Sequence, residues 1–195
     1  SGNGIVMGLV HSLTIEHCEA FENGADNRCD AGGPVGIWVW MCKNAIIQYC
    51  TSHNNHAGGT KDGGGFDIDG GSSNCIMQYN SSYDNEGAGY LLAEYGALFP
   101  FTNNIVRFNV SVNDGRKNNY GGIAVWGASS GYSVTNCTIY NNTICTDDSD
   151  LINGTPAAVT FMGTSFKNVL IANNIFVTKG NARFINADTL ISKSA

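Results

Sequence analysis

The chain has 195 residues and a formal net charge of −6, and it contains 25 glycines while only 13% of its residues are charged. Its length suffices for one domain with a sizeable core. The acidic balance argues against a nucleic-acid partner, because no basic patch is available to neutralise phosphates. The composition disfavours a helical bundle and favours many short strands joined by turns. No run of about 18 apolar residues occurs, so we expect no membrane insertion.

A short motif recurs along the chain at intervals of roughly 30 residues. It is found at 13–18, 45–50, 75–80, 104–109 and 169–174. The small or amide residue that ends the motif predicts one column, and a position five residues later predicts a second. The first column is Cys18, Cys50, Asn80, Asn109, Cys137 and Asn174, and the second is Asn23, Asn55, Asn85, Asp114 and Asn142. Stacked coils place equivalent residues about 4.8 Å apart, so amide side chains can hydrogen-bond along such columns.

A third apolar segment completes each repeat and starts near Ile37, Phe66, Tyr90, Ile123 and Val159. Three strands per repeat predict an all-β fold, a single-stranded parallel β-solenoid of about six coils. The columns and the segment 65–71 resemble the right-handed parallel β-helix proteins of the pectate-lyase-like superfamily. Such families usually carry an N-terminal cap, and none is visible before Gly4-Ile5. We therefore expect residues 1–195 to form one β-helix domain, in a fragment or a trimmed chain that lacks the cap.

The glycine-flanked segment 63–71 is the best candidate for a site. Strict alternation in Phe66-Asp67-Ile68-Asp69 has the period of a β-strand. Phe66 and Ile68 should therefore face the core, while the two carboxylates leave the other face together. The flanking glycines remove side chains that would crowd this face.

Loop lengths before the third strands predict a groove across the solenoid. The loop is shortest at 86–89 and longer in the coils on either side. The groove should therefore cross the chain at 86–89. Its predicted walls are the segments 31–34, 61–63, 116–117 and 146–148, together with an insertion at 94–101.

The outward positions of the stacked third strands predict a sugar-binding surface. One column contains Trp38, Asp67, Leu91 and Ala124, and the next contains Trp40, Asp69, Ala93 and Trp126. Indoles can stack on pyranose faces, and carboxylates can accept hydrogen bonds from sugar hydroxyls. We expect a glycan groove in which Trp38, Trp40, Trp126, Arg116 and Lys117 bind the substrate. The alternative is that the tryptophans pack under long loops and the aspartates cap turns.

Paired carboxylates can divide the acid and base roles of glycoside hydrolysis. Asp67 and Asp69 would lie about 6 to 7 Å apart by strand rise, between the retaining and inverting separations. We predict both as catalytic residues, with Lys61, His56 and Glu94 as further candidates.

The same aspartates, together with Asp62, are also candidates for a calcium site, because Ca²⁺ prefers carboxylate and carbonyl oxygens. Calcium would suit a lyase, in which the ion neutralises a uronate and Lys61 abstracts the adjacent proton. A hydrolase would require no cofactor. The catalytic residues of the family are not carried over, because neither signatures such as Gly-His-Gly nor pectate-lyase-like calcium sites are matched.

These observations predict a secreted carbohydrate-active β-helix protein, extracellular or at the cell surface, that binds and cleaves a polysaccharide as a lyase or a glycoside hydrolase. The alternative is a non-catalytic structural or adhesive β-solenoid that binds glycan. Open strand edges at both ends would allow end-to-end self-association.

The cysteines show neither a CxxC pair nor a zinc spacing. We interpret them as small buried core residues. A disulfide between Cys29 and Cys42 is the alternative.

Overall fold

The computed structural model describes residues 2–27, 33–59, 61–128, 131–151 and 153–187. These residues form short strands joined by turns and contain no helix. Within these ranges there is accordingly no apolar helix long enough to cross a membrane. The predicted all-β class is confirmed.

The strands stack into three sheets, here called A, B and C, and each coil visits the sheets in that order. Sheet A contains β1 (Ile5–Gly8), β4 (Val35–Trp40), β7 (Gly64–Asp69), β10 (Tyr90–Glu94), β13 (Gly121–Gly127), β17 (Ala157–Gly163) and β21 (Arg183–Ala187). Sheet B contains β2 (His11–Glu16), β5 (Lys43–Gln48), β8 (Ile76–Gln78), β11 (Ile105–Arg107), β15 (Thr138–Tyr140) and β19 (Leu170–Ala172). Sheet C contains β3 (Glu19–Phe21), β6 (Thr51–His53), β9 (Ser81–Tyr83), β12 (Val110–Val112), β16 (Thr143–Thr146) and β20 (Ile175–Thr178).

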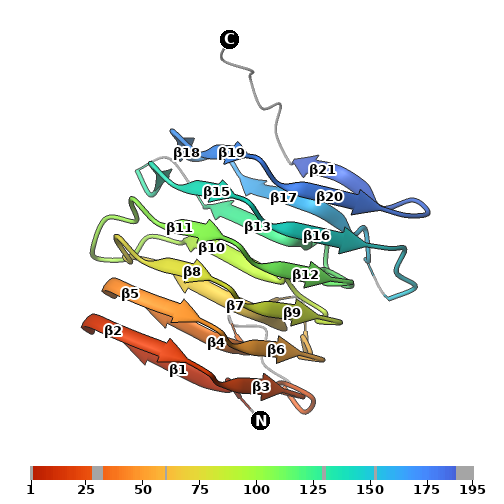
Figure 1. Cartoon of the computed structure of the whole chain (residues 1–195), viewed down its shortest axis with the longest axis horizontal. Helices are drawn as coiled ribbons and strands as arrows, with labels where there is room; N and C mark the ends of the chain where they lie inside the picture. The colour runs from red at the N-terminus through yellow and green to blue at the C-terminus, as the bar shows by residue number, and fades with distance from the viewer. Residues whose placement is uncertain (1, 28–32, 60, 129–130, 152, 188–195) are drawn as a thin grey trace.

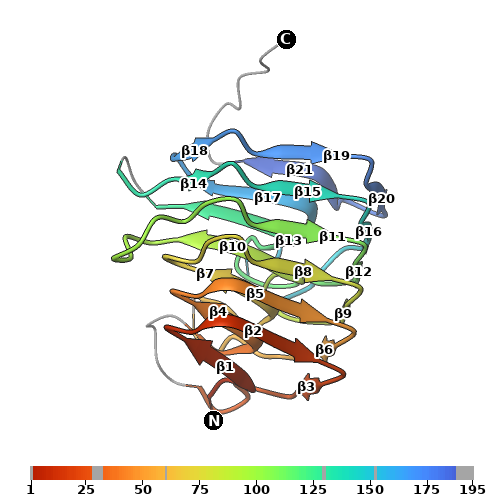
Figure 2. The same cartoon turned by 60° about the vertical axis from the view of Figure 1, so that its left-hand side comes forward.

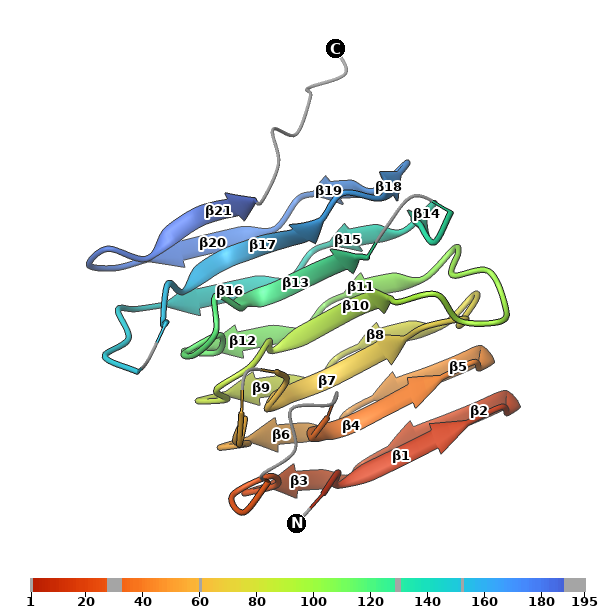
Figure 3. The same cartoon turned by 180° about the vertical axis from the view of Figure 1, so that it is seen from behind.

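A two-stranded sheet of β14 (Val134–Thr135) and β18 (Phe166–Lys167) completes the described fold. Figure 1 shows the coils stacked from the N-terminus at the bottom to the last coil at the top. Figure 2 gives a second view of sheets B and C, and Figure 3 turns sheet A toward the viewer. Neighbouring strands are parallel throughout, for example β4 with β7 and β10 with β13. The predicted parallel β-solenoid is therefore confirmed.

The register of sheet A agrees with the predicted columns. Ile37 pairs with Phe66, Phe66 with Tyr90, and Tyr90 with Ile123. These side chains are buried inside the coils, where they form the core with the apolar residues of sheets B and C. Alternation along each strand therefore points one set of side chains inward and leaves Trp38, Asp67 and the other predicted members on the outer face.

Two columns of amide and acid side chains hold the corners of the coils. The Oδ1 atom of Asn109 accepts the backbone N–H of Asn80 at 3.0 Å, and the same bond joins Asn142 to the N–H of Asn109. In the second column, Oδ1 of Asp114 accepts the N–H of Asn85 at 3.1 Å. Each side chain thus satisfies a backbone donor of the coil before it, at a corner where no strand partner is available.

The register corrects one part of the predicted columns. Asn142 belongs to the first column and not to the second, because it bonds to Asn109. Cys137 precedes Thr138, which pairs with Ile105, so Cys137 lies beside Asn104 instead. The motif was misaligned in this coil because a cysteine ends it in the first two coils, and Cys137 resembles that ending.

The six described cysteines, Cys42 among them, have free thiols, and Cys42, Cys50, Cys75 and Cys137 are buried. This agrees with their interpretation as core residues. The alternative disulfide involves Cys29, which lies outside the described residues.

The amide column should contribute measurably to stability. We expect Asn109→Ala to lower the free energy of unfolding by about 1 to 3 kcal/mol, because it leaves the buried N–H of Asn80 without an acceptor. Urea denaturation would measure the loss. Val110→Ala is the matched control, since this neighbouring side chain is 43% exposed. An equal loss in both variants would contradict a special role for the column.

Asp114 should make stability depend on pH. Burial raises the pKa of Asp114 from 3.8 to about 6, against the lowering effect of its hydrogen bonds from Ser111 and Asn85. A raised folded-state pKa means that the folded state binds more protons than the unfolded state between these values, so stability falls as pH rises from about 4 to 6. We expect Asp114→Asn to remove up to roughly 3 kcal/mol of this dependence, as measured by denaturation across that range. An unchanged slope would contradict the assignment.

Candidate functional site

The outer face of sheet A carries a cavity of about 460 Å³. Strands β4, β7, β10, β13 and β17 supply its floor, and the loops before β4, β7 and β13 supply its walls. It is lined by Gly33, Val35, Trp38, Lys61, Asp62, Asp67, Asp69, Leu91, Ala93, Tyr95, Tyr120, Trp126 and Met162. The segment 86–89, where the sequence predicted the groove, is not part of this lining.

The part of the cavity floor that β10 and β13 supply is apolar, although it lies outside the coil interior. Ala88, Leu91, Ala93, Tyr120 and Ala124 form a second buried cluster there. Trp126 and Met162 pack against this cluster and remain partly exposed. Small and aliphatic residues on β10 and β13 therefore leave room above the sheet, between the larger indole rings of Trp38 and Trp126.

Asp67 lies deep in the cavity. It is only 3% exposed, and its Oδ1 atom has no hydrogen-bond partner. Its neighbour in the register is Trp38, whose buried Nε1 atom also lacks a partner. Burial raises the pKa of Asp67 well above its usual range, and the charges of Asp69 and Asp62 raise it further. The buried surroundings of Asp67 therefore disfavour its ionised form.

Asp69 lies two residues further along β7 and is partly exposed. Its Oδ1 atom accepts the backbone N–H of Gly70 at 2.8 Å. Burial raises the pKa of Asp69 to about 7; the bond from Gly70 opposes this shift, and the charges of Asp62 and Glu94 add to it. Asp69 can therefore hold or release a proton near neutral pH.

Asp62 enters the cavity from the loop before β7. Its carboxylate accepts hydrogen bonds from the backbone N–H of Gly33 and, at 3.2 Å, from the hydroxyl of Tyr120. Burial raises the pKa of Asp62, while these two bonds and the charge of Lys61 lower it. Asp62 thus accepts hydrogen bonds that stabilise its ionised form, and Asp67 has no such bonds.

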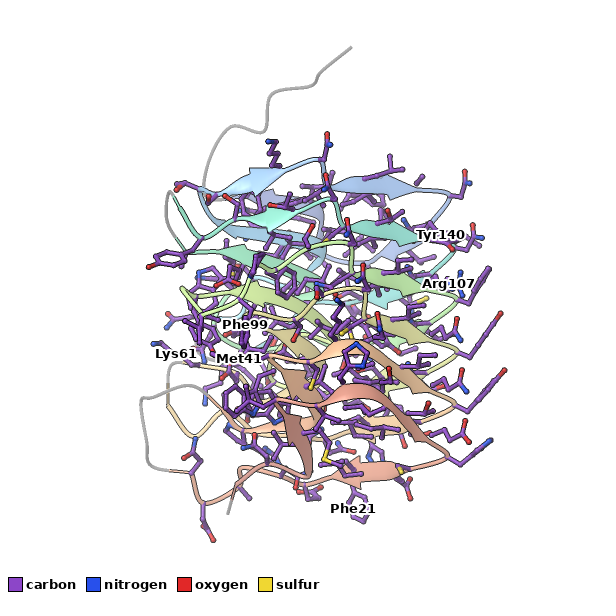
Figure 4. All side chains as sticks on the ribbon, turned by 90° about the vertical axis from the view of Figure 1, so that its left-hand side faces the viewer. Phe21, Met41, Lys61, Phe99, Arg107 and Tyr140 are labelled. Atoms are coloured by element: carbon purple, nitrogen blue, oxygen red, sulfur yellow. The ribbon has the colours of Figure 1, made fainter. Side chains whose placement is uncertain are left out.

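Lys61 and Tyr95 lie at the rim of the cavity. Lys61 is exposed, and Figure 4 shows it on the opposite side of the molecule from Arg107 and Tyr140 of sheet B. The ring of Tyr95 lies so close to Gly70 that a side chain at this glycine would collide with it. Gly70 therefore makes room for an aromatic ring beside Asp69.

Glu94, a predicted catalytic residue, is placed in a structural position. It is 2% exposed and does not line the cavity. Its carboxylate accepts the backbone N–H groups of Gly71 at 3.1 Å, Gly96 at 2.6 Å and Ala97 at 2.9 Å. Glu94 therefore anchors the insertion that follows β10.

Four other predicted site residues, Trp40, His56, Arg116 and Lys117, also lie outside the cavity lining. His56 contacts Glu22 at 3.0 Å and Glu86 at 3.3 Å, and Lys117 contacts Glu86 at 3.2 Å. These contacts join loops of successive coils. Arg116 lies 3.9 Å from Asp150, and the ring of Trp40 packs against Gly8.

The predicted calcium ligands Asp62, Asp67 and Asp69 all line the cavity, and calcium binding there stays a prediction. In the described part of the chain, no group of three or more His, Cys, Asp or Glu side chains is arranged to hold a metal ion. Asp62 and Asp69 instead use carboxylate oxygens to accept the N–H groups of Gly33 and Gly70.

Sequence reasoning missed Tyr120 and Met162 as lining residues, whereas Tyr95 lies in the insertion 94–101 that was predicted as a wall. The contact between Tyr120 and Asp62 joins residues 58 positions apart. No local pattern signals this contact, because it depends on how two loops of different length fold over the same sheet. Met162 could have been found, since it continues the column of Trp126 in the next coil.

Several carbohydrate-active proteins are similar to this chain. Lacto-N-biosidase of Bifidobacterium longum subsp. longum is 32% identical over 159 residues, which make up 78% of this chain and 8% of that protein. The crystal structure of GH136 lacto-N-biosidase from Eubacterium ramulus matches with a TM-score of 0.60 at 18% identity, over 91% of this chain and 26% of its own. The chain thus spans a small part of each lacto-N-biosidase.

Two alginate-processing structures share the fold at lower similarity. The periplasmic alginate epimerase AlgG matches with a TM-score of 0.53 at 17% identity, over 96% of this chain and 42% of its own. The alginate lyase from Paenibacillus sp. matches with a TM-score of 0.52 at 13% identity, over 93% and 69%. The model of the right-handed β-helix region matches residues 1–144. Because this match covers well over half of the sequence, the chain belongs to the right-handed β-helix family.

Proposed function

We propose that the chain contributes the active site of a glycoside hydrolase that acts on an oligosaccharide with a lacto-N-biosyl unit. The observation that carries this proposal is the presence of Asp62 and Asp69 in one cavity with different surroundings. Similarity to lacto-N-biosidase over most of the chain supports the choice of substrate. We further propose an extracellular or cell-surface location, where such a glycan would be met.

Asp69 is the better general acid of the pair. Its pKa is raised to about 7, chiefly by burial, so it can carry a proton to the leaving oxygen at neutral pH. Asp62 is the better base or nucleophile, because the N–H of Gly33 and the hydroxyl of Tyr120 stabilise its ionised form. The two carboxylates thus divide the roles that glycosidic cleavage needs.

The aromatic lining would hold the sugar rings. Trp38, Trp126 and Tyr95 surround the carboxylates, and aromatic faces pack well against the C–H face of a pyranose. Trp38 and Trp126 were predicted for this role. Tyr95, from the insertion after β10, adds a third ring.

The charges of the cavity favour hydrolysis of a neutral sugar over cleavage of a uronate. Three carboxyl groups line the cavity, and Lys61 at the rim is the only cationic side chain in that lining. A uronate would meet like charge there, which raises the cost of binding. A lyase reaction in which Lys61 abstracts a proton would need a uronate substrate, which the carboxyl groups of this cavity repel.

Removal of either proposed carboxylate should abolish cleavage. We expect Asp69→Asn and Asp62→Asn each to lower kcat/KM by roughly 10²-fold to 10⁴-fold on an aryl lacto-N-bioside, the range typical for a lost acid or base group. Release of the aryl group and of reducing ends would be measured. Asp84→Asn, at an exposed turn, is the matched control.

If the enzyme retains configuration, azide should restore turnover of an activated aryl substrate in both variants, and the product tells the roles apart: a glycosyl azide of inverted configuration in the variant that lacks the nucleophile, and one of retained configuration in the variant that lacks the acid. Full activity of both variants would refute the pair. An ultraviolet signal from an unsaturated uronate on alginate would identify a lyase instead.

The pH profile should follow Asp69. Because the acid must carry its proton, we expect kcat/KM to fall as pH rises through about 7, the value to which burial chiefly raises its pKa. Initial rates at low substrate concentration between pH 5 and pH 9 would give the profile, about two units on either side of this value. A rate that keeps rising through this range would show that Asp69 does not act in its protonated form.

A further inference from the structure

Two unpaired polar atoms belong to neighbouring residues that line the cavity. Among the described residues, few buried side-chain atoms lack a hydrogen-bond partner, and two of them are Nε1 of Trp38 and Oδ1 of Asp67. Both residues line the cavity, and they lie opposite one another on β4 and β7. A buried polar group without a partner costs about 1 to 3 kcal/mol. A bound group that pairs with both atoms would recover this cost.

We propose that Asp67 is a recognition residue that acts with Trp38 to bind an uncharged hydroxyl or amide substituent of the sugar ring. This inference rests on the proposed glycoside hydrolysis and gives Asp67 a different role from Asp62 and Asp69. The indole N–H can only donate, so the substituent must accept from Trp38. A protonated carboxyl group both donates and accepts, so the same substituent can exchange a hydrogen bond with Asp67.

The surroundings of Asp67 disfavour its ionised form. The titratable groups that line the same cavity are Lys61, Asp62, Asp69, Tyr95 and Tyr120. Burial, then the charges of Asp69 and Asp62, raises the pKa of Asp67. A carboxyl group whose ionisation is disfavoured is a poor base or nucleophile, and in its protonated form it can both donate and accept a hydrogen bond. A ligand with its own negative charge would be repelled by Asp62 and Asp69.

A site of this kind discriminates sharply between substrates. A site built to hydrogen-bond a substituent rejects an analogue that lacks it, because the buried protein atoms are then left unpaired. Leu91, the neighbour of Asp67 in the register on β10, is apolar and offers no polar group to compensate. Trp38 and Asp67 would therefore set which sugar is accepted, without taking part in bond cleavage.

The test compares three replacements by binding and by turnover. Binding of lacto-N-biose would be measured by calorimetry in the Asp69→Asn background, and turnover in the wild-type background. We expect Asp67→Asn, which keeps one donor and one acceptor, to weaken binding of lacto-N-biose less than Asp67→Ala does. Asp67→Ala and Trp38→Phe should each weaken binding by roughly tenfold, the size of one lost hydrogen bond.

Deoxy and deacylated analogues of lacto-N-biose identify the substituent. The penalty of Asp67→Ala should disappear on the one analogue that lacks the recognised group, which a structural role would not produce. Thermal unfolding of each variant would confirm that it folds.

Two results would overturn the proposal. Loss of turnover in Asp67→Asn as large as in Asp69→Asn would make Asp67 a catalytic carboxylate. Binding of lacto-N-biose and other uncharged disaccharides that is unaffected by Asp67→Ala, or absent altogether, would exclude recognition. Failure of the hydrolase proposal can be told apart from failure of the recognition proposal. In the first case wild-type turnover would be absent, while binding and its dependence on Asp67 would remain.

Discussion

The structure depends on hydrogen bonds that run from one coil to the next. In the sheets these are backbone bonds between parallel strands, and at the corners the side chains of Asn80, Asn109, Asn142 and Asp114 continue the same pattern. A corner amide replaces the partner that a turning backbone loses. This arrangement fixes the register, so every outward residue of sheet A is held directly beside its equivalents in the neighbouring coils.

The fold could be predicted almost completely because its constraints are periodic. The predicted inward positions and both outward columns of sheet A agree with the observed register, although most of the strands begin two residues earlier than predicted. The error at Cys137 and Asn142 arose because two different columns carry similar residue types. Periodicity thus locates coils well, and it fails where two positions of the repeat carry interchangeable side chains.

The candidate site could be predicted only in part, because its walls are not periodic. Asp67, Asp69, Trp38 and Trp126 come from the repeating strands and line the cavity as expected. The environments of the aspartates depend on loops of different length, so sequence alone could not reveal that Tyr120 bonds to Asp62. For the same reason His56, Arg116 and Lys117 were expected near the sugar, whereas they lie outside the cavity lining and contact other loops.

The bond between Asp62 and Tyr120 also constrains the order of events during folding. The two residues belong to different coils, with the coil of β10 lying between them. Coils of a solenoid gain stability by docking onto their neighbours, so growth proceeds stepwise along the axis. A chain that has formed only the coils up to β10 would already present both aspartates of β7, but without the hydroxyl that orients Asp62. Completion of the cavity therefore requires three consecutive coils, those of β7, β10 and β13, to be docked together.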